Sequence, residues 1–109
     1  MRDPLAPPIA AYLDASNGRN ADALIACFAP EAIVVDEGQT YRGSDEIRLW
    51  LARTVEAYAF TLEATHVAEQ GSETVVTCRV SGNFDGSPIQ LPFFFTLEDD
   101  KIAALTIRA

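Results

Sequence analysis

The hydrophobic pattern of this chain changes its period near Phe60, and no other feature of the sequence constrains the fold as strongly. Before Phe60, apolar residues recur at steps of three and four, which is the spacing of one face of a helix. After Phe60, apolar and polar residues alternate, which is the spacing of a strand with one buried face. We therefore expect helices in the first half of the chain and a sheet in the second.

The first two predicted helices are short and are joined by a tight turn. Residues 7–17 form the first helix, because two prolines suit its first turn and an Asn-Gly pair tolerates the left-handed backbone of a helix end. Asn20 can cap the second helix, whose apolar stripe is expected to reach Phe28. Pro30 then ends this helix, because the residue before a proline avoids the helical conformation.

The third predicted helix has the clearest amphipathic pattern. Ser44 or Asp45 can cap its beginning. A stripe of apolar and aromatic residues follows at helical spacing, namely Ile47, Trp50, Leu51, Thr54, Val55 and Tyr58. Such a helix must lie on an apolar surface.

The stretch FAPEAIVVDEGQTYRG, residues 28–43, predicts a small hairpin. Residues 32–36 are rich in β-branched side chains and too few for a helix, so they favour a strand. Gly38 breaks this strand, and residues 39–42 are expected to return beside it.

Asp36 is the first candidate for chemistry. It shares a strand face with Val34, so its carboxylate is expected to point into a cavity or to lie at its rim. Burial there would raise the pKa of Asp36 toward the range of a general base, whereas the alternative is a solvated strand-end or turn-capping acid. Glu37 alternates to the opposite face, and we expect it at the surface, because adjacent carboxylates on one strand do not converge on one atom.

Four strands are predicted in the second half, over residues 60–69, 74–84, 89–97 and 101–108, with turn residues between them. In the first of these strands His66 shares a face with Leu62 and Ala64, so we expect it to face inward. It is then either a core residue or a hydrogen-bond partner of Asp36 or of a ligand carbonyl. The chain has one histidine, so we expect no metal site, and no cofactor.

The order of these elements predicts an α+β architecture, with the helices grouped on one side of a curved, mostly antiparallel sheet. A long helix inside a curved sheet leaves a conical cavity, which is where such a fold would hold a small ligand. Aromatic side chains at helical and strand spacing form either the wall of this pocket or the core. The candidates for the wall are Trp50, Tyr41, Tyr58, Phe93 and Phe95.

Several motifs together resemble the SnoaL-like branch of the nuclear transport factor 2-like superfamily, which is also called the cystatin-like α+β cone fold. They are YLDASNGRNADAL at 12–24, FAPEAIVVDEG at 28–38, YRGSDEI at 41–47, VSGNF at 80–84 and KIAAL at 101–105. The resemblance covers nearly the whole chain, and it implies a single domain over residues 1–109. The superfamily includes isomerases, cyclases, hydrolases, dehydratases and proteins without catalysis, so the fold alone does not name the reaction.

The resemblance to steroid delta-isomerases of this superfamily is distant, and it suggests roles for individual residues. It implies that Asp36 is the general base and that Tyr12 holds the oxyanion. The inward face predicted for His66 adds the expectation that this residue assists. The family's third partner, an acidic hydrogen-bond donor, would fall within residues 91–93, which have no acidic group. The function implied is isomerase- or cyclase-type proton transfer on an apolar carbonyl compound; the alternative is a non-catalytic module that binds a ligand or dimerises.

Charge and composition limit the partners of the chain. The net charge of −8, with 8 basic against 16 acidic residues, disfavours nucleic acid, and no apolar run approaches the ~18 residues of a membrane span. Cys27 and Cys78 have no motif spacing, and residues 1–8 contain no signal peptide, so buried thiols and a cytoplasmic location are expected. The strand at 89–97 is apolar on both sides and Arg79 is expected on the outer face, so we predict a homodimer through that face.

Overall fold

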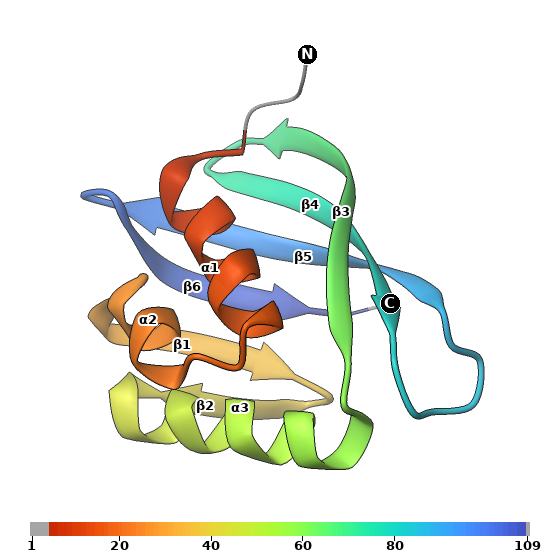
Figure 1. Cartoon of the computed structure of the whole chain (residues 1–109). Coiled ribbons are helices and arrows are strands. Elements are labelled where there is room, and N and C mark those ends of the chain that lie inside the picture. Colours follow the sequence, from red (N-terminus) through yellow and green to blue (C-terminus); the bar gives the residue numbers. More distant parts are fainter. Residues whose placement is uncertain (1–4, 109) are drawn as a thin grey trace.

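The computed structural model describes residues 5–108, and it has three helices on one face of a six-stranded sheet (Figure 1). The helices are α1 (Pro7–Asn17), α2 (Ala21–Ala26) and α3 (Gly43–Tyr58). The strands are β1 (Phe28–Asp36), β2 (Gln39–Arg42), β3 (Thr61–Gln70), β4 (Glu73–Ser81), β5 (Ile89–Glu98) and β6 (Lys101–Ile107). This confirms the predicted α+β architecture.

The sheet has the strand order β2-β1-β6-β5-β4-β3. All neighbouring strands are antiparallel except β1 and β6, which are parallel. In Figure 1, α1 crosses the concave face of the sheet, while α3 runs beneath it and packs on β1 and β2. The sheet therefore curves around α1 and α3.

The core lies between the helices and this concave face. Its fully buried members include Ile9 of α1, Ile47 of α3 and Leu105 of β6. Cys27 and Cys78 are buried free thiols, as predicted, and burial raises the pKa of Cys78 to about 12. Neither cysteine is therefore an activated nucleophile.

The junction between α2 and β1 differs from the prediction. Asn20 caps α2 as expected, since its Oδ1 accepts a hydrogen bond from the N–H of Ala23 at 3.1 Å. Phe28, however, begins β1 instead of ending α2, because it pairs with Ile102 of β6. The pairing is interrupted between Phe28 and Ile33, around Pro30, which has no N–H to donate.

The beginning of α3 also differs, because neither Ser44 nor Asp45 caps it. The helix begins two or three residues earlier, at Gly43, and no side chain caps it from the N-cap residue Arg42. Instead, Oε1 of Glu46 accepts a hydrogen bond from the N–H of Arg42 at 2.7 Å. A carboxylate in the first turn thus satisfies a backbone group at the positive end of the helix.

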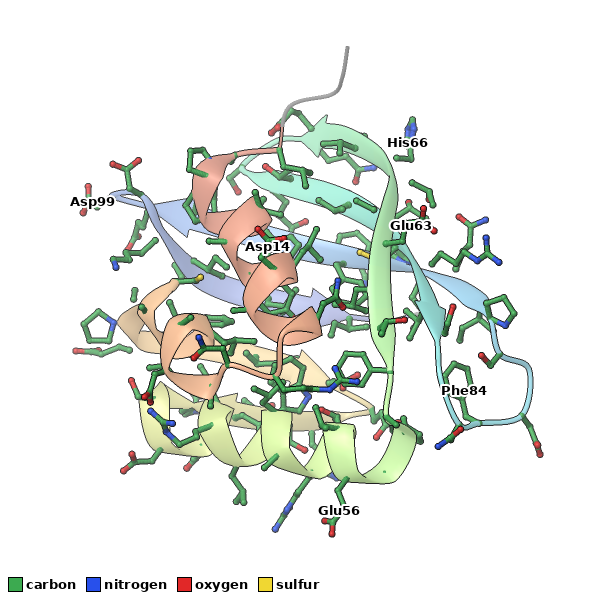
Figure 2. All side chains as sticks on the ribbon, in the orientation of Figure 1. Asp14, Glu56, Glu63, His66, Phe84 and Asp99 are labelled. Atoms are coloured by element: carbon green, nitrogen blue, oxygen red, sulfur yellow. The ribbon has the colours of Figure 1, made fainter. Side chains whose placement is uncertain are left out.

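The prediction that His66 faces inward is wrong. The pairing of β3 with β4 shifts register between Ala64 and His66, so Thr65 is an extra residue that reverses the alternation. His66 is exposed, and Figure 2 shows its imidazole pointing away from the protein. It therefore cannot assist Asp36.

The remaining strands end within a few residues of their predicted limits, except that β4 stops at Ser81 and a loop follows over residues 82–88. Arg79 is exposed on the outer face, as expected.

No helix within residues 5–108 is both long enough and apolar enough to cross a membrane. Residues 1–4, on which the expectation about a signal peptide partly rests, lie outside the described residues.

Candidate functional site

A cavity of about 260 Å³ lies between the helices and the concave face of the sheet. Its polar groups come from Tyr12, Asp36, Glu37, Trp50, Thr54 and Tyr58. The rest of its wall is apolar and consists of Phe60, Leu62, Val80, Phe84, Ile89, Leu91, Phe93 and Ile107. A mainly apolar pocket with a few polar groups is typical of a small-molecule site.

Asp36 lies in the wall of this cavity, at the end of β1. It shares a strand face with the fully buried Val34, as the alternation predicted. Its Oδ2 accepts a hydrogen bond from Nε1 of Trp50 at 2.9 Å. Burial raises the pKa of Asp36, and the charge of Glu37 adds to this effect, while the bond from Trp50 opposes it. Asp36 is therefore a more basic carboxylate than one in water, because burial partly excludes solvent from it.

Tyr12 reaches the cavity from α1 and is only 1% exposed. Its ring is held by edge contacts with Phe28 and Phe95, at centroid distances of 6.0 and 5.5 Å. Burial raises the pKa of Tyr12, and the nearby Cys78 and Asp36 raise it further, while no hydrogen bond within residues 5–108 contributes. The phenol is therefore protonated at neutral pH and free to donate to a ligand.

Glu37 is exposed, as predicted, but it also lines the cavity, which corrects the prediction that it points to the opposite face. Glu37 and Gly38 have φ values of 54° and 75°, so they form a two-residue hairpin turn between the paired residues Asp36 and Gln39. Because the turn begins at Glu37, the alternation of side chains between the two faces of β1 ends at Asp36. Oε2 of Glu37 accepts a hydrogen bond from the hydroxyl of Tyr58 at 3.0 Å, so both carboxylates belong to one site.

Three of the predicted aromatic wall residues line the cavity, namely Trp50, Tyr58 and Phe93. Tyr41 and Phe95 do not, contrary to prediction. Tyr41 lies on β2 and packs against Trp50 at a ring distance of 6.4 Å, and Phe95 is fully buried beside Phe93. Both support residues of the wall without reaching the cavity.

The loop over residues 82–88 contributes an aromatic side chain that the sequence pattern did not identify. Phe84 lines the cavity and packs edge-on against Tyr58 at 5.9 Å, and Figure 2 shows it in this loop. The loop is held against α3, since the N–H of Asn83 donates to the carbonyl of Tyr58 at 2.6 Å. Gly82 permits this approach, because a Cβ there would lie 2.5 Å from the same carbonyl oxygen. The sequence feature that could have indicated this contact is Gly82 with an aromatic residue, Phe84, two positions later.

Solved structures similar to this chain share its fold. A "putative polyketide cyclase" from Sinorhizobium meliloti is 36% identical, with a TM-score of 0.92 and coverage of 95% of both chains. A hypothetical protein with a ketosteroid isomerase-like fold from Catenulispora acidiphila, in complex with trimethylamine, is 22% identical, with a TM-score of 0.82 over 97% of this chain and 87% of that one. An NTF2-like protein of unknown function from Cytophaga hutchinsonii is 16% identical, with a TM-score of 0.77 over 99% and 93%.

No curated protein sequence matches the chain. The family model described as "SnoaL-like domain", in contrast, matches residues 9–105, which span all the helices and nearly all of the sheet. This match agrees with the fold and with the resemblance in the motifs. The chain therefore belongs to the SnoaL-like domain family.

Proposed function

We propose that the cavity binds a small, largely apolar carbonyl compound and that the chain catalyses proton transfer on it, as an isomerase or a cyclase does. Asp36 takes a proton from the carbon next to the carbonyl; the C–H bond breaks and its electron pair shifts onto the carbonyl oxygen. Tyr12 donates a hydrogen bond to the oxyanion that develops. An isomerase then returns the proton to another carbon, whereas in a cyclase the carbanion attacks a second carbonyl of the same molecule.

The observation that carries this proposal is a carboxylate with a raised pKa and an unpaired phenol in the wall of one apolar cavity. A base is most effective when its pKa approaches the working pH, which burial of Asp36 favours. Trp50 acts as a positioning residue, because its bond to Oδ2 fixes the orientation of the carboxylate.

The size of the cavity and the named relative agree with this chemistry. About 260 Å³ lies at the lower limit of the ~300–1,000 Å³ of typical ligand pockets, so the substrate is a compact molecule. The relative from Sinorhizobium meliloti is named for polyketide cyclisation, and ring closure of that kind begins with the same proton removal. Both observations favour a carbonyl compound of one or two rings.

Deuterium exchange tests the proposal. The protein is incubated in D₂O with 2-tetralone, a compact apolar ketone, and incorporation at the α-carbon is followed by NMR. Asp36→Asn should abolish the protein-dependent exchange, and Tyr12→Phe should reduce it by about 10²–10³-fold, as loss of an oxyanion donor does. The exposed Asp14 of α1, labelled in Figure 2, provides the matched control Asp14→Asn, which should leave the rate unchanged. Full exchange by folded Asp36→Asn would refute the role of the base.

A non-catalytic binding module is the second candidate, and the hydrogen bond from Trp50 favours it, since this bond stabilises the ionised form of Asp36 without requiring a reaction. The same experiment separates the two candidates. Saturable binding of 2-tetralone without any exchange would support the module.

We also propose that two copies of the chain pack through the outer face of the sheet. The strand register places five residues in one row across this face, namely Val35, Thr106, Phe94, Val75 and Ala68. The row lies opposite the buried Phe93 and Phe95, and among residues 5–108 all helices lie on the other face (Figure 1). The guanidinium of Arg108 lies 4.1 Å from the ring centroid of Phe94, but no helix within residues 5–108 covers the row. Its apolar and small side chains suit a self-complementary interface.

Sedimentation equilibrium tests this dimer. Phe94→Glu should convert a dimer into a monomer at micromolar concentration, because it buries a charge in the proposed interface. Leu49, which is 49% exposed on α3, provides the control Leu49→Glu, which should remain dimeric. A monomeric native chain at micromolar concentration would contradict the proposal.

A further inference from the structure

The cavity has an unbalanced charge. Asp36 and Glu37 both line it, and within residues 5–108 no Lys, Arg or His is among the lining residues. Arg19 lies 5.4 Å from the ring centroid of Phe60 but does not line the cavity. Its Nη1 already donates to the carbonyl of Ser16 at 3.1 Å. The residues of the site therefore leave its negative charge without a positive partner.

The apolar part of the wall is suited to a cation because much of it is aromatic. Trp50, Tyr58, Phe60, Phe84 and Phe93 all contribute rings. The face of an aromatic ring carries partial negative charge and attracts an organic ammonium group, most strongly where water is excluded. Tyr58 and Phe84 meet edge-to-face at 5.9 Å, close to the Glu37 carboxylate that Tyr58 contacts.

The two polar ends of the cavity require different hydrogen-bonding groups on a ligand. At the exposed end, Glu37 is held in place by the Tyr58 hydroxyl and can accept from a cationic donor. At the buried end, the Tyr12 hydroxyl lines the cavity with no hydrogen bond among residues 5–108, and it can donate to an acceptor. A matching ligand carries a positive donor at one end and an oxygen acceptor at the other.

We propose that the ligand is an apolar amino-carbonyl compound whose protonated amine is bound by Glu37 beside the paired rings of Tyr58 and Phe84, with its carbonyl directed at Tyr12. The carbonyl end rests on the proposed function, whereas the ammonium end does not. Glu37 thus selects the substrate by its charge, and Asp36, deeper in the wall, stays available as the base.

Three probes of similar size and different charge test the ammonium end by calorimetry, namely benzylammonium, benzyl alcohol and benzoate. Benzylammonium should bind about tenfold more tightly than benzyl alcohol, from an exposed ion pair together with cation–π contacts. Benzoate should not bind. Glu37→Gln should remove most of the preference for the cation. Glu56, which points away from α3 in Figure 2, provides the control Glu56→Gln, which should keep that preference.

The outcomes separate this inference from the proposed function. Equal affinity for benzylammonium and benzyl alcohol would overturn the ammonium site, even if exchange on 2-tetralone still depends on Asp36. A preference that survives in Glu37→Gln would also overturn it, because the cation would then be bound elsewhere. A Glu37-dependent preference, together with saturable binding of 2-tetralone but no exchange on it, would support the ammonium site and refute the proposed reaction.

Discussion

Asn17, at the end of α1, joins the helix that carries Tyr12 to the edge strand β3. Its Nδ2 donates to the carbonyl of Leu62 at 2.9 Å, and its Oδ1 accepts from the N–H of the same residue at 2.8 Å. Because β3 is an edge strand, these backbone groups have no strand neighbour on that side. The amide of Asn17 therefore replaces a strand at this position, and Asn17→Ala would remove both bonds.

The expected loss of stability follows from these contacts. Each hydrogen bond contributes about 0.5–1.5 kcal/mol, so the pair contributes roughly 1–3 kcal/mol. Alanine is a better helix former than asparagine by up to about 0.7 kcal/mol, which offsets part of the loss. We expect Asn17→Ala to lower the free energy of unfolding by about 1–2 kcal/mol, and the melting temperature by roughly 5–15 °C in a domain of this size.

Urea denaturation measures this change. The urea concentration at the midpoint of unfolding should fall. The slope of the unfolding free energy against urea concentration should stay constant, since the surface exposed on unfolding is nearly the same. Asp14→Ala is the matched control, because Asp14 is exposed on the same helix and the change tests helix propensity alone. A loss below about 0.5 kcal/mol, or a loss equal to that of the control, would refute the reasoning.

Three further predictions concern the site. Burial raises the pKa of Asp36 in the folded state, so its ionisation destabilises the fold. Asp36→Asn should therefore be more stable than the native chain at neutral pH, and urea titrations should show this advantage shrinking as the pH falls through the raised pKa and absent below about pH 4. Trp50→Phe keeps an aromatic wall but loses the hydrogen bond that lowers the pKa of Asp36. The pH below which the exchange rate falls should therefore be higher in this variant than in the native chain. An unchanged pH profile would contradict this. Gly82→Ala places a methyl group against the carbonyl of Tyr58, so thermal melting should show a loss of about 1–3 kcal/mol and ligand affinity should fall; an unchanged melt would mean that the loop adapts freely.

Periodicity predicted the parts of this protein in which the backbone is regular. Spacing identified the buried stripe of α3 and the inward direction of Asp36, while two prolines and an Asn-Gly pair set the limits of α1. It failed where a single residue interrupts a strand. The alternation of inward and outward side chains reverses at Thr65 in β3, and it stops at Glu37, where the hairpin turn begins. Both events depend on single backbone conformations, and a pattern averaged over several residues does not detect them.

The other differences come from contacts between distant parts of the chain. Phe28 has a suitable place in the stripe of α2, but it joins β1 because Ile102 is available beside it. Phe95 and Tyr41 were as plausible for the wall as Phe93, and only the curvature of the sheet decides which rings reach the cavity. Local sequence contains no information on either point.

The parallel pairing of β1 with β6 has a consequence for how this protein folds. Asp36 stands opposite Ile107 in that pairing, so the strand with the proposed base docks beside the last strand of the chain. Contacts between such distant segments form slowly, because a long loop must close before they stabilise anything. The β3–β6 meander, whose contacts are local, can form first. We therefore expect β1 to join the sheet in a late step, and the catalytic groups to come together only when folding is nearly complete.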